Sequence, residues 1–212
     1  KPAGKLPASG ENMPTTIHTS GNLKIVVRQF PSSRGLKDRR VQKTLSEILK
    51  RRIRIESPLF ELQTPAKQNY FVGTRFVEGE ELEQRMSKST PEERLKFVHQ
   101  MAETMAKLHV NALSHGHMHA RNFIIRNNKL VLVDSKYLVE MPKVFSPEEV
   151  ETAALRAPSL LHPMAALLFG YLPTVSPISL EMSIAIKDLR KSEQAEFIKR
   201  YIEKYCELYR KK

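Results

Sequence analysis

Residues 113–139, LSHGHMHARNFIIRNNKLVLVDSKYLV, restrict the possible folds of this chain more than any other stretch. A His-Gly turn is followed by Asn122, a short apolar run, the pair Asn127-Asn128 and a second apolar run that stops at Asp134. Paired Asn residues between two apolar runs are typical of a tight β-hairpin. The spacing therefore predicts two neighbouring strands, with the amide of Asn122 at the start of the first and the carboxylate of Asp134 at the end of the second. Such a pair can hold a divalent metal.

This stretch resembles the H-G-D-x-H-x-x-N…(I/V)-D-F-G core of small kinase-like proteins, in which the Asn and the D-F-G Asp hold the metal. It is most similar to the lipopolysaccharide-core sugar kinases and the atypical kinases of the RIO and Bud32 type. Two positions differ, because His117 replaces the catalytic Asp and Asp134-Ser135-Lys136 replaces D-F-G. The resemblance implies that Asn122 and Asp134 bind Mg²⁺ and that His117 faces the acceptor hydroxyl.

Other segments follow in the order of kinase-like folds. Residues 22–30, NLKIVVRQF, resemble the strand that carries V-A-I-K, with Arg28 at the Lys position that contacts the α- and β-phosphates. Residues 36–54 have apolar side chains three to five positions apart, which predicts an amphipathic helix. In kinases the helix at this place supplies a Glu partner to the Lys. The resemblance therefore implies that Glu47 is the partner of Arg28.

Residues 71–82, FVGTRFVEGEEL, resemble the hinge segment E-Y-x-E-G-x-x-L of these kinases. The resemblance implies that the backbone around Thr74, Phe76 and Val77 binds the adenine of ATP. It covers residues 21–139, and the Gly-rich loop G-x-G-x-x-G is absent from the sequence.

The order of elements predicts an α+β class with a two-lobed protein-kinase-like fold. Strand-like segments dominate residues 15–78, which we expect to form a small β-rich lobe with one helix. Residues 79–212 are expected to form a mainly helical lobe. Its clearest helix begins with Thr90-Pro-Glu-Glu93, a capping box. Residues 1–14 are rich in Lys, Pro, Gly and Ser and are predicted to be a flexible arm.

Composition sets further bounds. The chain has 212 residues and a net charge of +12, and a positive field attracts nucleotides, nucleic acid, acidic proteins and anionic membrane surfaces. No apolar run reaches the ~18 residues of a membrane span. The single cysteine, Cys206, excludes an internal disulfide framework and is typical of a reducing compartment. We therefore expect a cytoplasmic protein, with peripheral membrane binding as one use of its charge.

Three readings of the function stay open. The first is an ATP- and Mg²⁺-dependent phosphotransferase acting on a sugar, a lipid-linked glycan or a protein hydroxyl, with His117 accepting the proton. The second is a pseudokinase that recruits an anionic partner without catalysis. The third is a zinc site, because alternate side chains of an extended H-x-H-x-H segment share a face and His115, His117 and His119 have this pattern.

Overall fold

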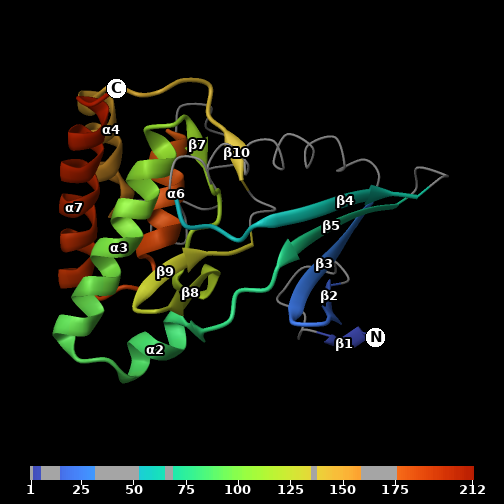
Figure 1. Ribbon diagram of the computed structural model, residues 1–212. Coiled ribbons are helices and arrows are strands. Elements are labelled where there is room, and N and C mark those ends of the chain that lie inside the picture. Colours follow the sequence, from blue (N-terminus) through green and yellow to red (C-terminus); the bar gives the residue numbers. More distant parts are fainter. Residues whose placement is uncertain (1, 6–14, 32–52, 65–68, 135–137, 159–175) are drawn as a thin grey trace. The chain divides into compact units, whose positions relative to one another are not determined.

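The computed structural model describes residues 2–5, 15–31, 53–64, 69–134, 138–158 and 176–212 (Figure 1). The chain divides into two compact units, Lys1–Glu78 (unit 1) and Gly79–Lys212 (unit 2). Glu47, Lys136 and residues 36–52 of the predicted amphipathic helix lie outside the described residues. Ile53 and Arg54, at the end of that predicted helix, are described and are not helical.

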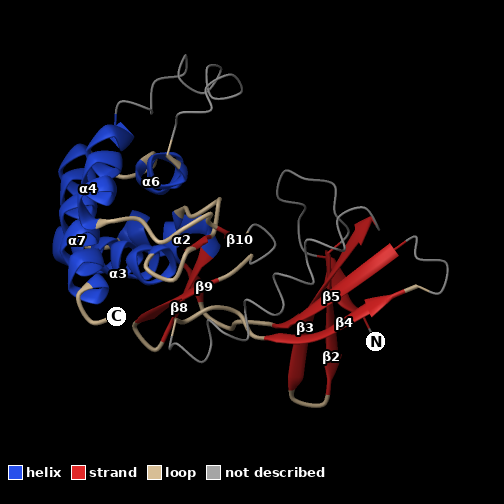
Figure 2. Cartoon of the chain, turned by 90° about the horizontal axis from the view of Figure 1, so that it is seen from above, coloured by secondary structure: helices blue, strands red, loops and turns tan. Residues whose placement is uncertain are grey.

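Unit 1 is built on an antiparallel sheet whose described strands run in the order β1-β2-β3-β5-β4 (Figure 2). The strands are β1 (Pro2–Lys5), β2 (Thr15–Ser20), β3 (Leu23–Pro31), β4 (Pro58–Gln63) and β5 (Asn69–Arg75). Strand β1 falls within the segment that was expected to be a flexible arm, and it pairs with β2. Val26 of β3 and Val72 of β5 are buried, so the two central strands carry part of the core.

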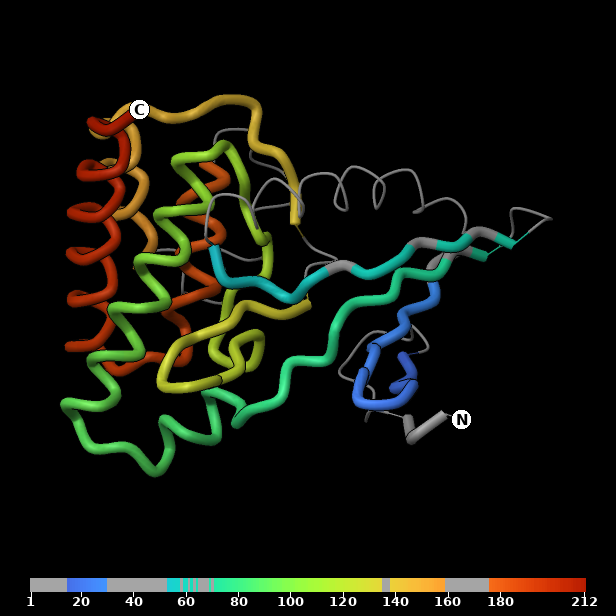
Figure 3. Tube along the Cα trace, in the orientation of Figure 1, coloured from blue at the N-terminus to red at the C-terminus, as the bar shows by residue number. Residues whose placement is uncertain are grey.

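Unit 2 is mainly helical, and α3 and α7 pack along each other (Figures 1 and 3). Its helices are α2 (Leu82–Lys88), α3 (Pro91–His109), the 3₁₀ turn η1 (Ala120–Asn122), α4 (Pro147–Arg156), α6 (Pro177–Ile186) and α7 (Lys191–Tyr209). Its strands are β6 (Glu80–Glu81), β7 (Leu113–Ser114), β8 (Phe123–Arg126), β9 (Lys129–Leu132) and β10 (Val139–Glu140). The predicted α+β class, with a small sheet unit before a mainly helical unit, is confirmed. None of the described helices is both long and apolar enough to cross a membrane.

Local sequence signals explain where α3 begins. The Thr90 hydroxyl accepts a hydrogen bond from the Glu93 backbone N–H at 3.2 Å, and the Glu93 carboxylate accepts one from the Thr90 N–H at 3.2 Å. This confirms the predicted capping box, which satisfies two N–H groups that have no partner inside the helix. A second capping box, between Ser146 and Glu149, starts α4. Apolar residues of α3 and α7 then face one another in the core of unit 2, among them Met101, Met105, Phe197 and Tyr201.

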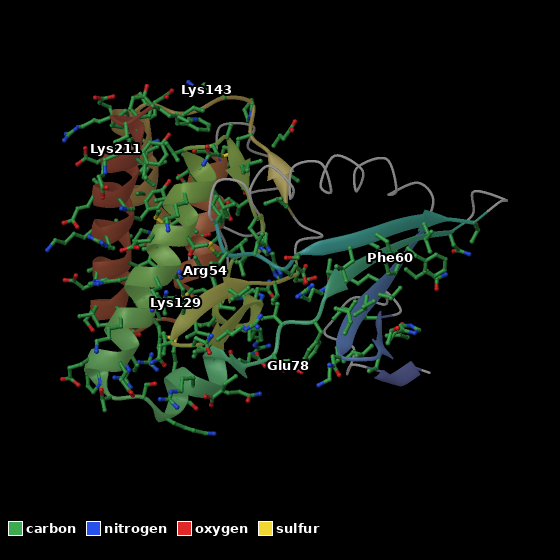
Figure 4. The ribbon with its side chains drawn as sticks, in the orientation of Figure 1. Arg54, Phe60, Glu78, Lys129, Lys143 and Lys211 are labelled. Atoms are coloured by element: carbon green, nitrogen blue, oxygen red, sulfur yellow. The ribbon has the colours of Figure 1, made fainter. Side chains whose placement is uncertain are left out.

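The β8–β9 hairpin forms where the Asn pair predicted it. Asn127 and Asn128 have φ angles of 52° and 56°, the left-handed conformation that two-residue hairpin turns require. Gln100 of α3 fixes this turn, because its side chain accepts from the Leu130 N–H at 3.0 Å and donates to the Asn128 carbonyl at 3.4 Å. Lys129, labelled in Figure 4, marks the turn. The hairpin that carries the candidate site is therefore held against α3.

Gly79 is required by a close approach of two backbones. Its φ is 155°, and a Cβ placed on it would lie 2.2 Å from the carbonyl oxygen of Ile125, which pairs with Glu80. We expect Gly79→Ala to lower the free energy of unfolding by about 3 kcal/mol, since a backbone atom cannot move aside. Chemical denaturation measures this. Gly21→Ala is the control, because Gly21 has a φ of 56° but open space around its Cβ, and should cost about 1 kcal/mol. Equal losses would contradict the steric argument.

Candidate active site

The two predicted metal ligands lie at the same end of the β8–β9 hairpin. Asn122 directly precedes β8, and Asp134 follows the end of β9 by two residues. The backbone N–H of Val133, next to Asp134, donates to the Asn122 carbonyl at 2.8 Å. The chain segments that carry the two side chains are thus hydrogen-bonded to each other.

A hydrogen bond to the preceding loop orients the side chain of Asn122. Its Nδ2 donates to the carbonyl oxygen of His117 at 2.8 Å. A carbonyl only accepts, so the amide nitrogen must face it and Oδ1 must point the other way. Oδ1 makes no hydrogen bond to any described residue, although the residue is buried. This leaves one hard oxygen ready to accept a ligand.

Asp134 adopts an unusual backbone conformation. Its φ is 64°, in the left-handed region that most non-glycine residues avoid and that Asp and Asn tolerate best. Residues held in such conformations are concentrated at functional sites. Its half-buried carboxylate and the Oδ1 of Asn122 both offer a hard oxygen ligand to a metal ion. That donor set fits Mg²⁺, which binds one or two carboxylates together with phosphate oxygens.

The three histidines of the loop make different contacts. His115 is fully buried, and its Nε2 donates to the Val133 carbonyl at 3.1 Å. His119 accepts a hydrogen bond at Nδ1 from the Arg121 N–H at 3.2 Å and so caps η1. The rings of His117 and His119 meet edge to face, with centroids 4.5 Å apart. Within the described ranges no group of three or more His, Cys, Asp or Glu is arranged to hold a metal ion, so the three imidazoles do not form the zinc site that H-x-H-x-H suggested.

His119 is held in its neutral form. Burial lowers the pKa of its imidazole to about 4, and the neighbouring His117 and Lys187 contribute to the same direction.

This lowered pKa predicts how stability depends on pH. The unfolded chain binds the His119 proton near its ordinary pKa of 6.5, whereas the folded chain resists it down to about 4. Stability is therefore fully present above pH 6.5 and is lost as the pH falls towards 4, by about 3 kcal/mol in total. Urea denaturation at several pH values measures this slope. The His119→Asn variant, which keeps an acceptor for the Arg121 N–H, should lose that part of the slope, and an unchanged slope would contradict the assignment.

In unit 1, Arg28 of β3 sits in a cluster with Glu56 and Thr74. The two terminal nitrogens of Arg28 lie 3.4 Å from the Glu56 carboxylate, and Nη1 donates to the Thr74 hydroxyl at 3.2 Å. That hydroxyl donates in turn to Glu56 at 3.2 Å. Both Glu56 and Thr74 are buried. Among the described residues, the acidic partner of Arg28 is thus Glu56, which precedes β4; the predicted partner Glu47 lies outside the described residues.

The backbone N–H groups of the hinge-like segment differ in whether they already have a partner in unit 1. The N–H of Arg75 donates to the Ser57 carbonyl at 2.8 Å, and that of Phe76 donates to the Lys24 carbonyl at 2.9 Å. These two groups are therefore used inside unit 1. The N–H of Val77 makes no hydrogen bond within the part of the chain that the structure describes. Glu78, labelled in Figure 4, is exposed and bonds to Lys24 at 2.8 Å, which supports a structural role.

Sequence reasoning missed Glu56 and Glu181. Glu181 of α6 is fully buried and accepts hydrogen bonds from the loop that leads to His117. A signal for it exists in the sequence, because it is the one charged residue in the otherwise apolar helix PISLEMSIAI. A lone acid in such a helix is expected to be paired inside the protein. Glu56 has no comparable signal.

Comparisons with known proteins bear on the fold that carries this site. No protein-family model matches the chain. The KEOPS complex subunit Bud32 of Pyrococcus abyssi is 32% identical over 76 residues, which are 36% of this chain and 33% of that protein, so the chain spans about a third of its relative's length. WaaP, solved in complex with acyl carrier protein, superimposes with a TM-score of 0.57 and 14% identity, over 99% of this chain and 83% of that chain. The resemblance that the motifs predicted is thereby confirmed: the chain has the fold of the protein-kinase-like superfamily.

Proposed function

We propose that this chain is an atypical kinase-like phosphotransferase that uses ATP and Mg²⁺ to phosphorylate a hydroxyl group. The observation that carries the proposal is the pairing of Asn122 and Asp134 at one end of the hairpin, with Asn122 bonded to the carbonyl of His117. A metal-binding pair and a candidate base then share one hydrogen-bonded loop. The acceptor is a sugar, a lipid-linked glycan or a protein hydroxyl.

Each residue has a role in this proposal. Oδ1 of Asn122 and the carboxylate of Asp134 would hold Mg²⁺, which when bound neutralises charge on the phosphates. Arg28 would contact the α- and β-phosphates, with Glu56 and Thr74 fixing its guanidinium. The N–H of Val77, which bonds to no described residue, would donate to a ring nitrogen of adenine. Of the residues predicted to bind adenine, Thr74, Phe76 and Val77, it is Val77 that would supply this donor.

His117 would act at the acceptor. The bond between the γ-phosphorus and its bridging oxygen breaks, a bond to the acceptor oxygen forms, and the hydroxyl proton passes to the imidazole of His117. Imidazole accepts protons near neutral pH. Phosphoryl transfer depends mostly on positioning and on charge neutralisation. A histidine at this position is therefore compatible with slow turnover.

A pseudokinase is the second candidate, and two observations favour it. The base position holds an imidazole in place of a carboxylate. Unit 1 also carries fifteen of the 35 Lys and Arg residues but only six of the 23 Asp and Glu residues. Such an excess attracts an anionic partner, whether nucleic acid, an acidic protein or a membrane surface. The structural relative is solved with a carrier protein, which makes a protein partner the first to test.

Titration with ATP, with and without Mg²⁺, separates these candidates. At a nucleotide concentration one hundred times the Kd, binding should stabilise the folded chain by ~2.7 kcal/mol, measured by thermal unfolding. Excess EDTA should abolish most of that gain. ADP release in the presence of acceptor hydroxyls would support the transferase. Stabilisation without turnover would leave the pseudokinase, and no stabilisation by any nucleotide would overturn the ATP- and Mg²⁺-dependent transferase.

A further inference from the structure

The chain leaves the sheet of unit 1 just before the hinge-like segment. Ile25 of β3 and Arg75 of β5 are the last pair of residues in the ladder between these two strands. Phe76, Val77 and Glu78 lie beyond that ladder, so contacts outside the strand pairing must fix their backbone. The N–H that Val77 would offer to adenine binds best when its direction is fixed in advance, because ordering a flexible segment costs binding free energy.

Lys24 of β3 holds this segment at two residues. Its backbone carbonyl accepts a hydrogen bond from the Phe76 N–H at 2.9 Å, and its Nζ lies over the Phe76 ring, 5.7 Å from the centroid. The same Nζ donates to the Glu78 carboxylate at 2.8 Å. The residues on both sides of Val77 are thus joined to a single lysine.

The geometry of these contacts matters more than the strength of each one. The side chains of Lys24 and Glu78 are 49% and 68% exposed, and an exposed ion pair or cation–π contact contributes little by itself. Here one cation restrains Phe76 and Glu78 together, and the peptide groups of Val77 lie between them. Lys24 is itself anchored, because it pairs with Thr19 of β2 in the sheet.

We propose that Lys24 is a positioning residue, which directs the N–H of Val77 towards the adenine ring. The role at adenine rests on the function proposed above. Lys24 acts through the backbone of the hinge-like segment and makes no contact with the nucleotide in this proposal. Removal of either end of the Lys24–Glu78 pair should therefore weaken the binding of the base and leave the binding of the phosphates.

Two variants of opposite charge separate this role from a long-range effect of charge. Lys24→Met keeps the apolar length of the lysine stem but removes the cation, and Glu78→Ala removes its acceptor. The electric field alone would make loss of the cation weaken nucleotide binding and loss of the acid strengthen it. A positioning role predicts that both variants lose affinity for the base. Arg75→Met is the matched control, since Arg75 is an exposed cation directly before Phe76 and its side chain bonds to no described residue.

Isothermal titration calorimetry with Mg²⁺-ATP and with Mg²⁺-tripolyphosphate measures the contribution of the base, because tripolyphosphate has none. The ratio of the two affinities should fall about three- to tenfold in Lys24→Met and in Glu78→Ala, as expected for the loss of an exposed ion pair and a cation–π contact. The double variant should lose no more than the weaker-binding single variant, because both changes remove the same contact. Arg75→Met should leave the ratio unchanged.

A measurement without nucleotide keeps this result separate from the proposed function. The order parameter of the Val77 N–H, from ¹⁵N relaxation, should be about 0.85 in the wild type and should fall towards about 0.6 in Lys24→Met and Glu78→Ala. Arg75→Met should match the wild type.

Two results would overturn the positioning role. One is a Val77 amide that is as mobile in the wild type as in the two variants. The other is a pair of affinity ratios that change in opposite directions in Lys24→Met and Glu78→Ala. A wild-type chain that binds no Mg²⁺-ATP, but whose Val77 amide is ordered and becomes mobile in both variants, would refute the phosphotransferase and leave the hold of Lys24 on this segment standing.

Discussion

Affinity for Mg²⁺-ATP should fall roughly a hundredfold when Asp134 is replaced by Asn. The change removes the one anionic ligand assigned to the metal. Even in high dielectric, a unit negative charge about 2 Å from a divalent cation contributes about 4 kcal/mol, part of which the amide oxygen retains. The folded state should be little affected, because Asn tolerates the left-handed φ of 64° as well as Asp does.

Isothermal titration calorimetry of both proteins with ATP and excess Mg²⁺ measures this loss. Asp188→Asn is a matched control, since Asp188 is an exposed aspartate just beyond α6 and is assigned no ligand role. That variant should bind as the wild type does. Equal affinity of the wild type and Asp134→Asn, with unfolding curves that coincide, would show that Asp134 is not a metal ligand.

The second large effect is expected at His117. If the imidazole is a poor replacement for the carboxylate of related kinases, His117→Asp should raise the rate of phosphoryl transfer. General-base catalysis typically contributes ~10²–10⁴-fold, so even partial restoration is measurable as ATP turnover. The carbonyl of His117, which orients Asn122, belongs to the backbone and is retained in the variant.

His117→Asn serves as the control for this experiment, because it matches Asp in size but cannot accept a proton at neutral pH. If ATP turnover rises equally in both variants, the gain comes from the smaller side chain and not from a restored base. Metal content measured on the same samples should show no zinc in any of them. If His117→Asp turns over ATP as slowly as the wild type, position 117 does not supply the base of the reaction.

Local signals made much of the fold predictable from the sequence. Thr90 with Glu93, and Asn127 with Asn128, act through atoms a few residues apart, so their capping box and hairpin turn can be read directly from the sequence. The short strands β7 and β10 were not predicted. They are two residues each, Ser114 pairs with Val139 across 25 positions, and no periodicity develops over such a length.

The candidate site was predictable only in part, for a related reason. Asn122 and Asp134 are joined by one hairpin, so their proximity follows from local structure. Glu56 reaches Arg28 across 28 positions, and Glu181 reaches Ser114 across 67. Which acid fills a buried pairing position depends on how helices and strands pack, and helical periodicity does not encode that choice. Glu56 illustrates this, since no local pattern before β4 marks it as a partner of Arg28.

The buried bonds between α3 and α7 have a consequence for synthesis on the ribosome. His109 meets Tyr201 across 92 positions, and Arg94 meets Glu193 across 99. Helix α3 is translated before α7, so Arg94 lacks Glu193 and His109 lacks Tyr201 until α7 has left the ribosome. Until then the apolar face of α3 is not covered by α7 and Arg94 lacks its acidic partner, which favours chaperone binding at this helix and closure of unit 2 in one late step.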